Sequence, residues 1–158
     1  MVVKDIISED FLQYSKPSMF IITTKCSFKC EKDSGCPGMC QNAKVVLQPD
    51  VQVANSNIVS MYEQNEITQA IVFGGLEPFD TFEEMLALIQ EFRTKLNDDI
   101  VIYTGYTESE ISDKVDTLKQ FKNIIVKFGR YVPNTSARYD EVLGVHLASP
   151  NQYARRIS

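Results

Sequence analysis

The chain has 158 residues, a formal charge of −5, a pI of about 4.9 and 44% hydrophobic residues. This composition is typical of a globular chain and excludes a mainly disordered or collagen-like one. No basic stripe is present to bind nucleic acid, no apolar run is long enough to cross a bilayer, and residues 1–13 are unlike a signal peptide. We therefore expect a single domain over residues 1–158, in the cytoplasm, without a nucleic-acid or membrane partner.

Strand-like and helical patterns alternate along the first half of the chain. Met19–Thr23 is the first strand-like run, and it leads into a loop over residues 24–42 that contains every cysteine. Val45–Leu47 is typical of a brief strand and Ile58–Gln64 of a short helix. A second apolar strand is predicted over Gln69–Phe73.

The second half continues this alternation, and its helices carry recognisable start signals. Asp80 and Thr81 open a helix, and Thr81 with Glu84 predicts a capping box. Thr107 with Glu110 predicts a second capping box at the start of the next helix. The remaining strands are predicted over Ile100–Tyr103, Ile124–Val126 and Leu143–Leu147.

The alternation of strands and helices predicts a parallel sheet with right-handed crossovers. The chain is much shorter than a closed eight-unit barrel of about 250 residues. We therefore expect an α/β fold with an open, partly curved and mainly parallel sheet, a partial TIM-like half-barrel, whose helices cover the outer face.

Unusual loops follow the predicted strands. Because the carboxyl ends of parallel strands share one edge of a sheet, loops that are distant in sequence should meet there and form one site. These loops are Cys26–Cys40, Gly74–Pro78, Thr104–Tyr106, Gly129–Arg130 and Ser149–Asn151.

The four cysteines are the strongest chemical signal in the sequence. Cys26, Cys30, Cys36 and Cys40 are separated by three, five and three residues. A reducing cytosol disfavours disulfides, so clustered thiols indicate a metal or iron–sulfur site. Zinc knuckles usually have two residues between cysteines, whereas cluster spacings vary, and spacing alone leaves both kinds of site open.

With these motifs identified, the chain resembles the radical S-adenosylmethionine (SAM) enzymes, and among them the small activating proteins of anaerobic ribonucleoside-triphosphate reductases. The order and placement of four motifs carry the resemblance. They are Cys26-x-x-x-Cys30 closing with Cys40-Gln41-Asn42, then Gly74-Gly75-Leu76-Glu77-Pro78, Tyr103-Thr104-Gly105-Tyr106 and Ser149-Pro150-Asn151-Gln152.

The resemblance implies that three cysteines hold a [4Fe–4S] cluster with one iron left open for SAM. Cys26 and Cys30 would be two of the ligands. The loop is longer than the family's usual one, so the third ligand is either Cys40 or Cys36, and Asn42 favours Cys40 because it keeps the family's register.

The resemblance also implies which residues contact SAM. Paired glycines would let the backbone approach the methionine part closely, although a strand-to-helix turn explains them too. Leu76 departs from the family's uninterrupted Gly-Gly-Glu triplet. Glu77 would accept a hydrogen bond from the ammonium group of the methionine part of SAM. The alternative interpretation is that Glu77 is a solvated charge. The implied contact residues are Gly74, Gly75, Glu77, Thr104, Ser149 and Asn151.

Two further residues, Lys127 and Arg130, each have two interpretations, whereas His146 has one. Lys127 and Arg130 would neutralise ligand charge, or else remain solvated as charges near strand ends usually do. His146 is the only histidine, lies in an apolar run and is interpreted as structural.

The function implied by the resemblance is that of an activase. It would cleave SAM reductively to a 5′-deoxyadenosyl radical and generate a glycyl radical on a large partner, an anaerobic ribonucleotide reductase, using a flavodoxin-type reductant. Two alternatives remain, a radical SAM enzyme with another substrate and a structural or interaction domain that binds zinc through four cysteines. The zinc site would need all four cysteines, whereas the cluster leaves either Cys36 or Cys40 dispensable.

Overall fold

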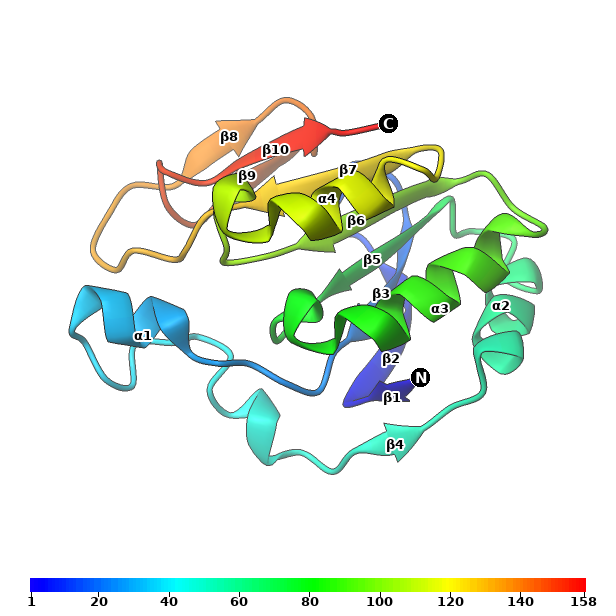
Figure 1. The fold of residues 1–158 in the computed structure, drawn as a ribbon, viewed down its shortest axis with the longest axis horizontal. Helices are drawn as coiled ribbons and strands as arrows, with labels where there is room; N and C mark the ends of the chain where they lie inside the picture. Colours follow the sequence, from blue (N-terminus) through cyan, green and yellow to red (C-terminus); the bar gives the residue numbers. More distant parts are fainter.

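A six-stranded mixed sheet is the centre of the computed structural model, which describes residues 1–158 (Figure 1). The strand order is β10-β7-β6-β5-β3-β2, in which the four inner strands are parallel and the two edge strands are antiparallel to their neighbours. The predicted α/β class with a mainly parallel sheet is therefore confirmed. The strands are β2 (Asp5–Asp10), β3 (Ser18–Ile22), β5 (Ala70–Gly74), β6 (Asp99–Tyr103), β7 (Ile124–Phe128) and β10 (Tyr153–Arg156).

Alternating side chains of the inner strands build two hydrophobic cores. Ile71 and Phe73 belong to a core of 23 buried residues beneath the helices, whereas Ala70 and Val72 belong to one of 8 residues on the opposite face. The helices of the larger core are α2 (Asn55–Glu63), α3 (Phe82–Arg93) and α4 (Ser112–Leu118). The smaller core is covered by the region of the hairpin β8 (Arg138–Asp140) and β9 (Val145–Leu147).

The remaining elements are short. A two-stranded sheet joins β1 (Val2–Val3) to β4 (Val51–Gln52). The cysteine loop contains the six-residue helix α1 (Lys29–Ser34), which lies beyond the carboxyl ends of the parallel strands (Figure 1). Three 3₁₀ helices complete the fold, η1 (Val45–Leu47), η2 (Pro78–Thr81) and η3 (Glu108–Ile111). No helix has both the length and the apolar character needed to span a membrane.

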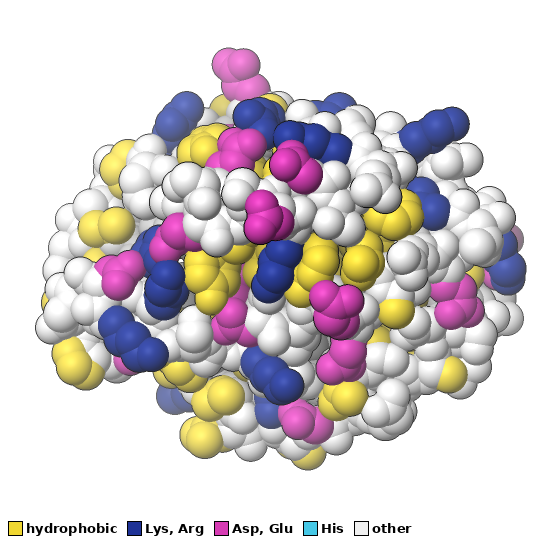
Figure 2. Space-filling view, viewed as in Figure 1, with side chains coloured by type: hydrophobic (Ala, Val, Ile, Leu, Met, Phe, Trp, Pro, Cys, Tyr) yellow, Lys and Arg dark blue, Asp and Glu magenta, His cyan; other side chains and the backbone are white.

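Charged side chains are interspersed on the face of the molecule that α3 and α4 cover. Figure 2 shows Lys and Arg beside Asp and Glu on this face, with no broad area of one sign. The polar sides of the amphipathic helices therefore point to solvent while their apolar sides face the larger core.

Several element predictions were wrong at the margins of the sheet. Leu143–Leu147 does not add a strand to the main sheet, because β9 pairs only with β8. Val45–Leu47 forms a 3₁₀ turn rather than a strand. The edge strands β2 and β10 were not predicted, because five of the six residues of β2 and all of β10 except Ala154 are at least partly exposed and their polar sequences lack an apolar strand pattern.

The two predicted capping boxes had different outcomes. The box of Thr107 and Glu110 is present at the start of η3. The box of Thr81 and Glu84 is absent, because η2 runs directly into α3 and the hydroxyl of Thr81 donates to the carbonyl of Pro78 at 3.3 Å. The Glu84 carboxylate instead accepts a hydrogen bond from the backbone N–H of Val2, at 2.6 Å.

Asp99, at the start of β6, connects three segments at the amino-terminal edge of the parallel strands. Its carboxylate accepts hydrogen bonds from Tyr14 (2.9 Å), Lys16 (2.5 Å) and Arg156 (2.8 Å). Burial alone would raise the pKa of Asp99, but these hydrogen bonds outweigh burial and hold its pKa below the ordinary value.

We predict that Asp99→Asn lowers the free energy of unfolding at pH 7 by about 1–3 kcal/mol, because three donors lose a charged acceptor. A carboxylate with a lowered pKa stabilises the fold above its unfolded pKa of about 3.9, and this contribution is lost as the pH falls through the folded pKa. Urea unfolding at pH 7 and pH 3 should therefore show a smaller difference from wild type at pH 3. Asp116→Asn, which changes an exposed carboxylate, is the control. If Asp99→Asn lowers the free energy of unfolding equally at both pH values, the prediction is contradicted.

Candidate functional site

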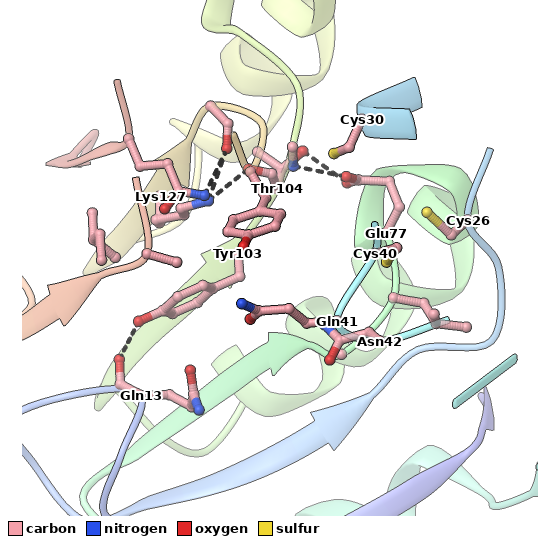
Figure 3. Close-up of a pocket in the computed structure, with 18 of the residues that line it drawn as sticks. Gln13, Cys26, Cys30, Cys40, Gln41, Asn42, Glu77, Tyr103, Thr104 and Lys127 are labelled. Carbon is pink, nitrogen blue, oxygen red and sulfur yellow. Dashed lines mark hydrogen bonds between the residues drawn. The ribbon is translucent and has the colours of Figure 1, made fainter. Parts of the chain in front are cut away.

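A cavity of about 370 Å³ opens where the parallel strands end (Figure 3). Its wall includes Gly75 and Glu77 after β5, Thr104 and Gly105 after β6, and Gly129 after β7. Together with the cysteine loop after β3, the loops after four parallel strands thus meet at one edge of the sheet, as their positions in the sequence predict.

Three of the four cysteines line this cavity. Cys26 precedes α1, Cys30 lies within it and Cys40 follows it, whereas Cys36 is exposed and does not line the cavity. The backbone N–H of Cys40 donates to the Glu31 carboxylate at 3.1 Å, which ties the returning part of the loop to the helix. No group of three His, Cys, Asp or Glu side chains lies close enough to hold a single metal ion.

The thiols of Cys26 and Cys40 are in an environment that disfavours the thiolate form when no cation is bound. Burial raises the pKa of Cys26 to about 11, and burial also raises the pKa of Cys40 above its ordinary value. A metal centre binds thiolates and reverses this preference, so metal binding at these residues would release protons. Three partly buried thiols around one cavity fit a cluster in which different irons each take one thiolate.

Glu77 is held rigidly in the cavity wall. Its buried carboxylate accepts hydrogen bonds from the Thr104 hydroxyl (2.7 Å) and from the backbone N–H groups of Gly105 (2.9 Å) and Phe79 (3.1 Å). Burial outweighs these bonds and raises the pKa of Glu77 to about 7. The alternative that Glu77 is a solvated charge is therefore wrong.

Close packing against β3 explains why glycine occupies positions 74 and 75, in addition to their location at the site. A Cβ on Gly74 would lie 2.9 Å from the ring of Phe20, and one on Gly75 would lie 2.5 Å from Cγ2 of Ile22. Gly75 also has a φ of +78°, which favours glycine. The glycines therefore allow β5 to turn sharply against β3, and Gly75 lines the cavity.

Lys127 is a buried cation in the cavity wall, so the expectation that it remains solvated is wrong. Its ammonium donates to the carbonyl oxygens of Gly129 (2.9 Å) and Thr104 (3.4 Å), and no carboxylate forms a salt bridge with it. Burial lowers the pKa of Lys127 to about 8. A buried ammonium without an acidic partner favours an anionic ligand group beside it.

Ser149 and Asn151 do not line the cavity. The Ser149 hydroxyl accepts from the backbone N–H of Val132 at 2.8 Å, and the Asn151 side-chain amide donates to the Arg130 carbonyl at 2.9 Å. Both side chains thus hold the loop after β7, and their contact with a cofactor stays a prediction. Gln152, from the same motif, lines the cavity.

Other cavity residues were not found from the sequence. No motif contains Gln13 or Tyr131, and Tyr103 belongs to a motif in which the resemblance assigns it no contact. His146 was interpreted as structural, but it is exposed on β9, lines the cavity and lies against the ring of Tyr139, with centroids 5.2 Å apart. The strand-end position of Tyr103 is the one signal that would have identified any of them.

We predict that Thr104→Val destabilises the protein by about 1–3 kcal/mol, because the buried Glu77 carboxylate loses its shortest hydrogen bond without a replacement. Denaturant unfolding of the two proteins measures the effect. Thr104→Ser, which keeps the hydroxyl, should recover most of the loss, and an equally unstable Ser variant would show that the methyl group, not the hydrogen bond, matters.

One comparison with known proteins identifies a family. Residues 18–148 match the family described as 4Fe-4S single cluster domain. The matched segment contains the cysteine loop and all cavity residues except Leu12, Gln13 and Gln152. No curated protein and no solved structure matches the chain. Because the match covers most of the chain and includes the three convergent thiols, this protein belongs to the 4Fe-4S single cluster domain family.

Proposed function

We propose that this protein is a radical SAM activating enzyme that generates a glycyl radical on a partner, an anaerobic ribonucleotide reductase. The observation that carries the proposal is that Cys26, Cys30 and Cys40 share one cavity with the buried carboxylate of Glu77 and the buried ammonium of Lys127. Membership of the 4Fe-4S single cluster domain family supports the iron–sulfur part of it.

The cluster ligands in this proposal are Cys26, Cys30 and Cys40. Cys36 is the spare cysteine, because it is exposed and does not line the cavity. Three ligands would leave one iron open, and an open coordination position distinguishes a reactive centre from a closed structural one. When bound, the cluster supplies one electron for cleavage of the sulfonium C–S bond of SAM, with methionine and a 5′-deoxyadenosyl radical as products.

The polar residues of the cavity match the charges of a methionine group. The Glu77 carboxylate would accept a hydrogen bond from the ammonium of the ligand, and the Lys127 ammonium would lie on the side of its carboxylate. With a pKa of about 7, Glu77 becomes a better acceptor when a cation is bound, since a nearby positive charge lowers its pKa. The volume of about 370 Å³ is within the range of small-molecule sites.

The partner would reach the site from the open side of the cavity. Leu12 lines the cavity and is 76% exposed, and His146 is an exposed lining residue from β9. A glycine-containing segment of the partner would therefore approach between the connection from β2 to β3 and the β8–β9 hairpin. Electrons would come from a flavodoxin-type reductant. The fold is also compatible with this proposal, because its four parallel strands could form part of a half-barrel.

We predict that the protein, reconstituted with iron and sulfide without oxygen, binds about four irons per chain and has a broad visible charge-transfer absorption. Addition of SAM should perturb that absorption, and chemical reduction should then release methionine and 5′-deoxyadenosine. Metal analysis, spectroscopy and product analysis measure these results. A protein that takes up only zinc and leaves SAM intact after reduction contradicts the proposed function.

Single cysteine substitutions test the ligand assignment. Cys26→Ala, Cys30→Ala and Cys40→Ala should each lose most of the bound iron, because each removes one thiolate from the cavity. Cys36→Ala, the matched control in the same loop, should keep the iron content and spectrum of the wild type. Loss of iron from Cys36→Ala together with retention by Cys40→Ala would exchange the roles of these two residues, and loss from all four variants would favour a site built from all four cysteines.

A further inference from the structure

Arg130 connects the cysteine helix to two other parts of the sheet edge. It follows β7 and Gly129, and only 15% of its side chain is exposed. Its guanidinium donates to both carboxylate oxygens of Glu110 at 2.7 and 2.8 Å, and Lys29 of α1 donates to the same carboxylate at 2.8 Å. These hydrogen bonds hold the pKa of Glu110 well below its ordinary value, so the carboxylate stays charged and α1 stays attached to η3 and β7.

The opposite edge of the guanidinium faces the end of α1. The Nε atom of Arg130 lies 2.7 Å from a carboxylate oxygen of Asp33, yet its N–H is not directed at that oxygen. This N–H is the one buried side-chain polar group in the structure without a hydrogen-bond acceptor. A buried donor without an acceptor is costly, so a group near it that gains negative charge would be stabilised.

Cys30 lies on the same side of Gly105 as the Arg130 side chain. A Cβ built on Gly105 would be 3.2 Å from the sulfur of Cys30 and 3.8 Å from Cγ of Arg130. The ring of Tyr106 supports the arrangement, since Lys29 Nζ and Arg130 Cζ lie 5.1 and 5.9 Å from its centroid. The set of two cations and the two carboxylates of Asp33 and Glu110 sums to zero charge, so removing any one charged side chain leaves a net charge near the sulfur.

We propose that Arg130 is a positioning residue that anchors α1 and keeps a positive charge beside Cys30, and thereby raises the reduction potential of the cluster. The inference rests on the proposed cluster ligation by Cys30. Reduction adds one electron to the cluster, and a neighbouring cation stabilises the more negative, reduced form. Net charge and hydrogen bonds around the sulfurs are known determinants of cluster potentials.

The test is a redox titration of the reconstituted protein, monitored by electron paramagnetic resonance, in four variants. Arg130→Gln should shift the midpoint potential to more negative values, and Arg130→Lys, which keeps the charge, should shift it less. Asp33→Asn should shift it in the positive direction, because Arg130 is then neutralised less. Arg155→Gln, which removes an exposed arginine paired with Glu108, is the matched control and should leave the potential unchanged.

The outcomes separate this inference from the proposed function. If the wild type binds a four-iron cluster but Arg130→Gln and Arg155→Gln have the same potential, the role of Arg130 is overturned while the proposed function stands. If Arg130→Gln loses its cluster, Asp33→Asn decides, and an unchanged potential in that variant overturns the inference. A wild type that binds no four-iron cluster would overturn both.

Discussion

The hydrogen bond between Thr104 and Glu77 joins the loops after β5 and β6 at the cavity, and the geometry of the site depends on it. Glu77 follows the sharp turn at Gly75, and without a partner its buried carboxylate would be costly in this position. The backbone N–H of Gly105 completes the contact and brings the β6 loop towards Cys30. One carboxylate thus fixes the loops after two inner strands relative to each other at the cavity.

The electrostatics of the cavity have a consistent direction. Burial keeps the thiols of Cys26 and Cys40 protonated, raises the pKa of Glu77 and lowers the pKa of Lys127. Each of these groups therefore resists its charged form until an opposite charge arrives. A site with such groups gains stability when it binds a metal centre and a zwitterionic ligand, because several buried groups are then paired simultaneously.

The centre of the fold could be predicted from the sequence because the inner strands are apolar on both faces and their helices are amphipathic. Ala70–Gly74, for example, is buried at every position, which a continuous apolar run indicates. The edges could not be predicted, since β2 and β10 are held by backbone pairing that leaves no hydrophobic pattern.

The site was predicted only as far as loops could be assigned to strand ends. This placed Glu77, Thr104 and three of the cysteines together, because each follows or lies close after a parallel strand. It did not reveal that Ser149 and Asn151 hold a neighbouring loop, nor that Lys127 is buried, since both facts depend on how the chain returns across the smaller core. Side-chain burial near a strand end is a tertiary property that spacing does not encode.

The unequal coverage of the two faces of the sheet also has a consequence for how this cavity can change. Val145, His146 and Leu147 line it from a three-residue strand that is attached to a core of 8 residues, whereas the helices pack on a core of 23. Most of the packing that stabilises the domain therefore lies on the side away from that wall. Changes in the sequence or conformation of the hairpin can therefore alter the shape of the entrance while Cys26, Cys30 and Glu77 keep their positions.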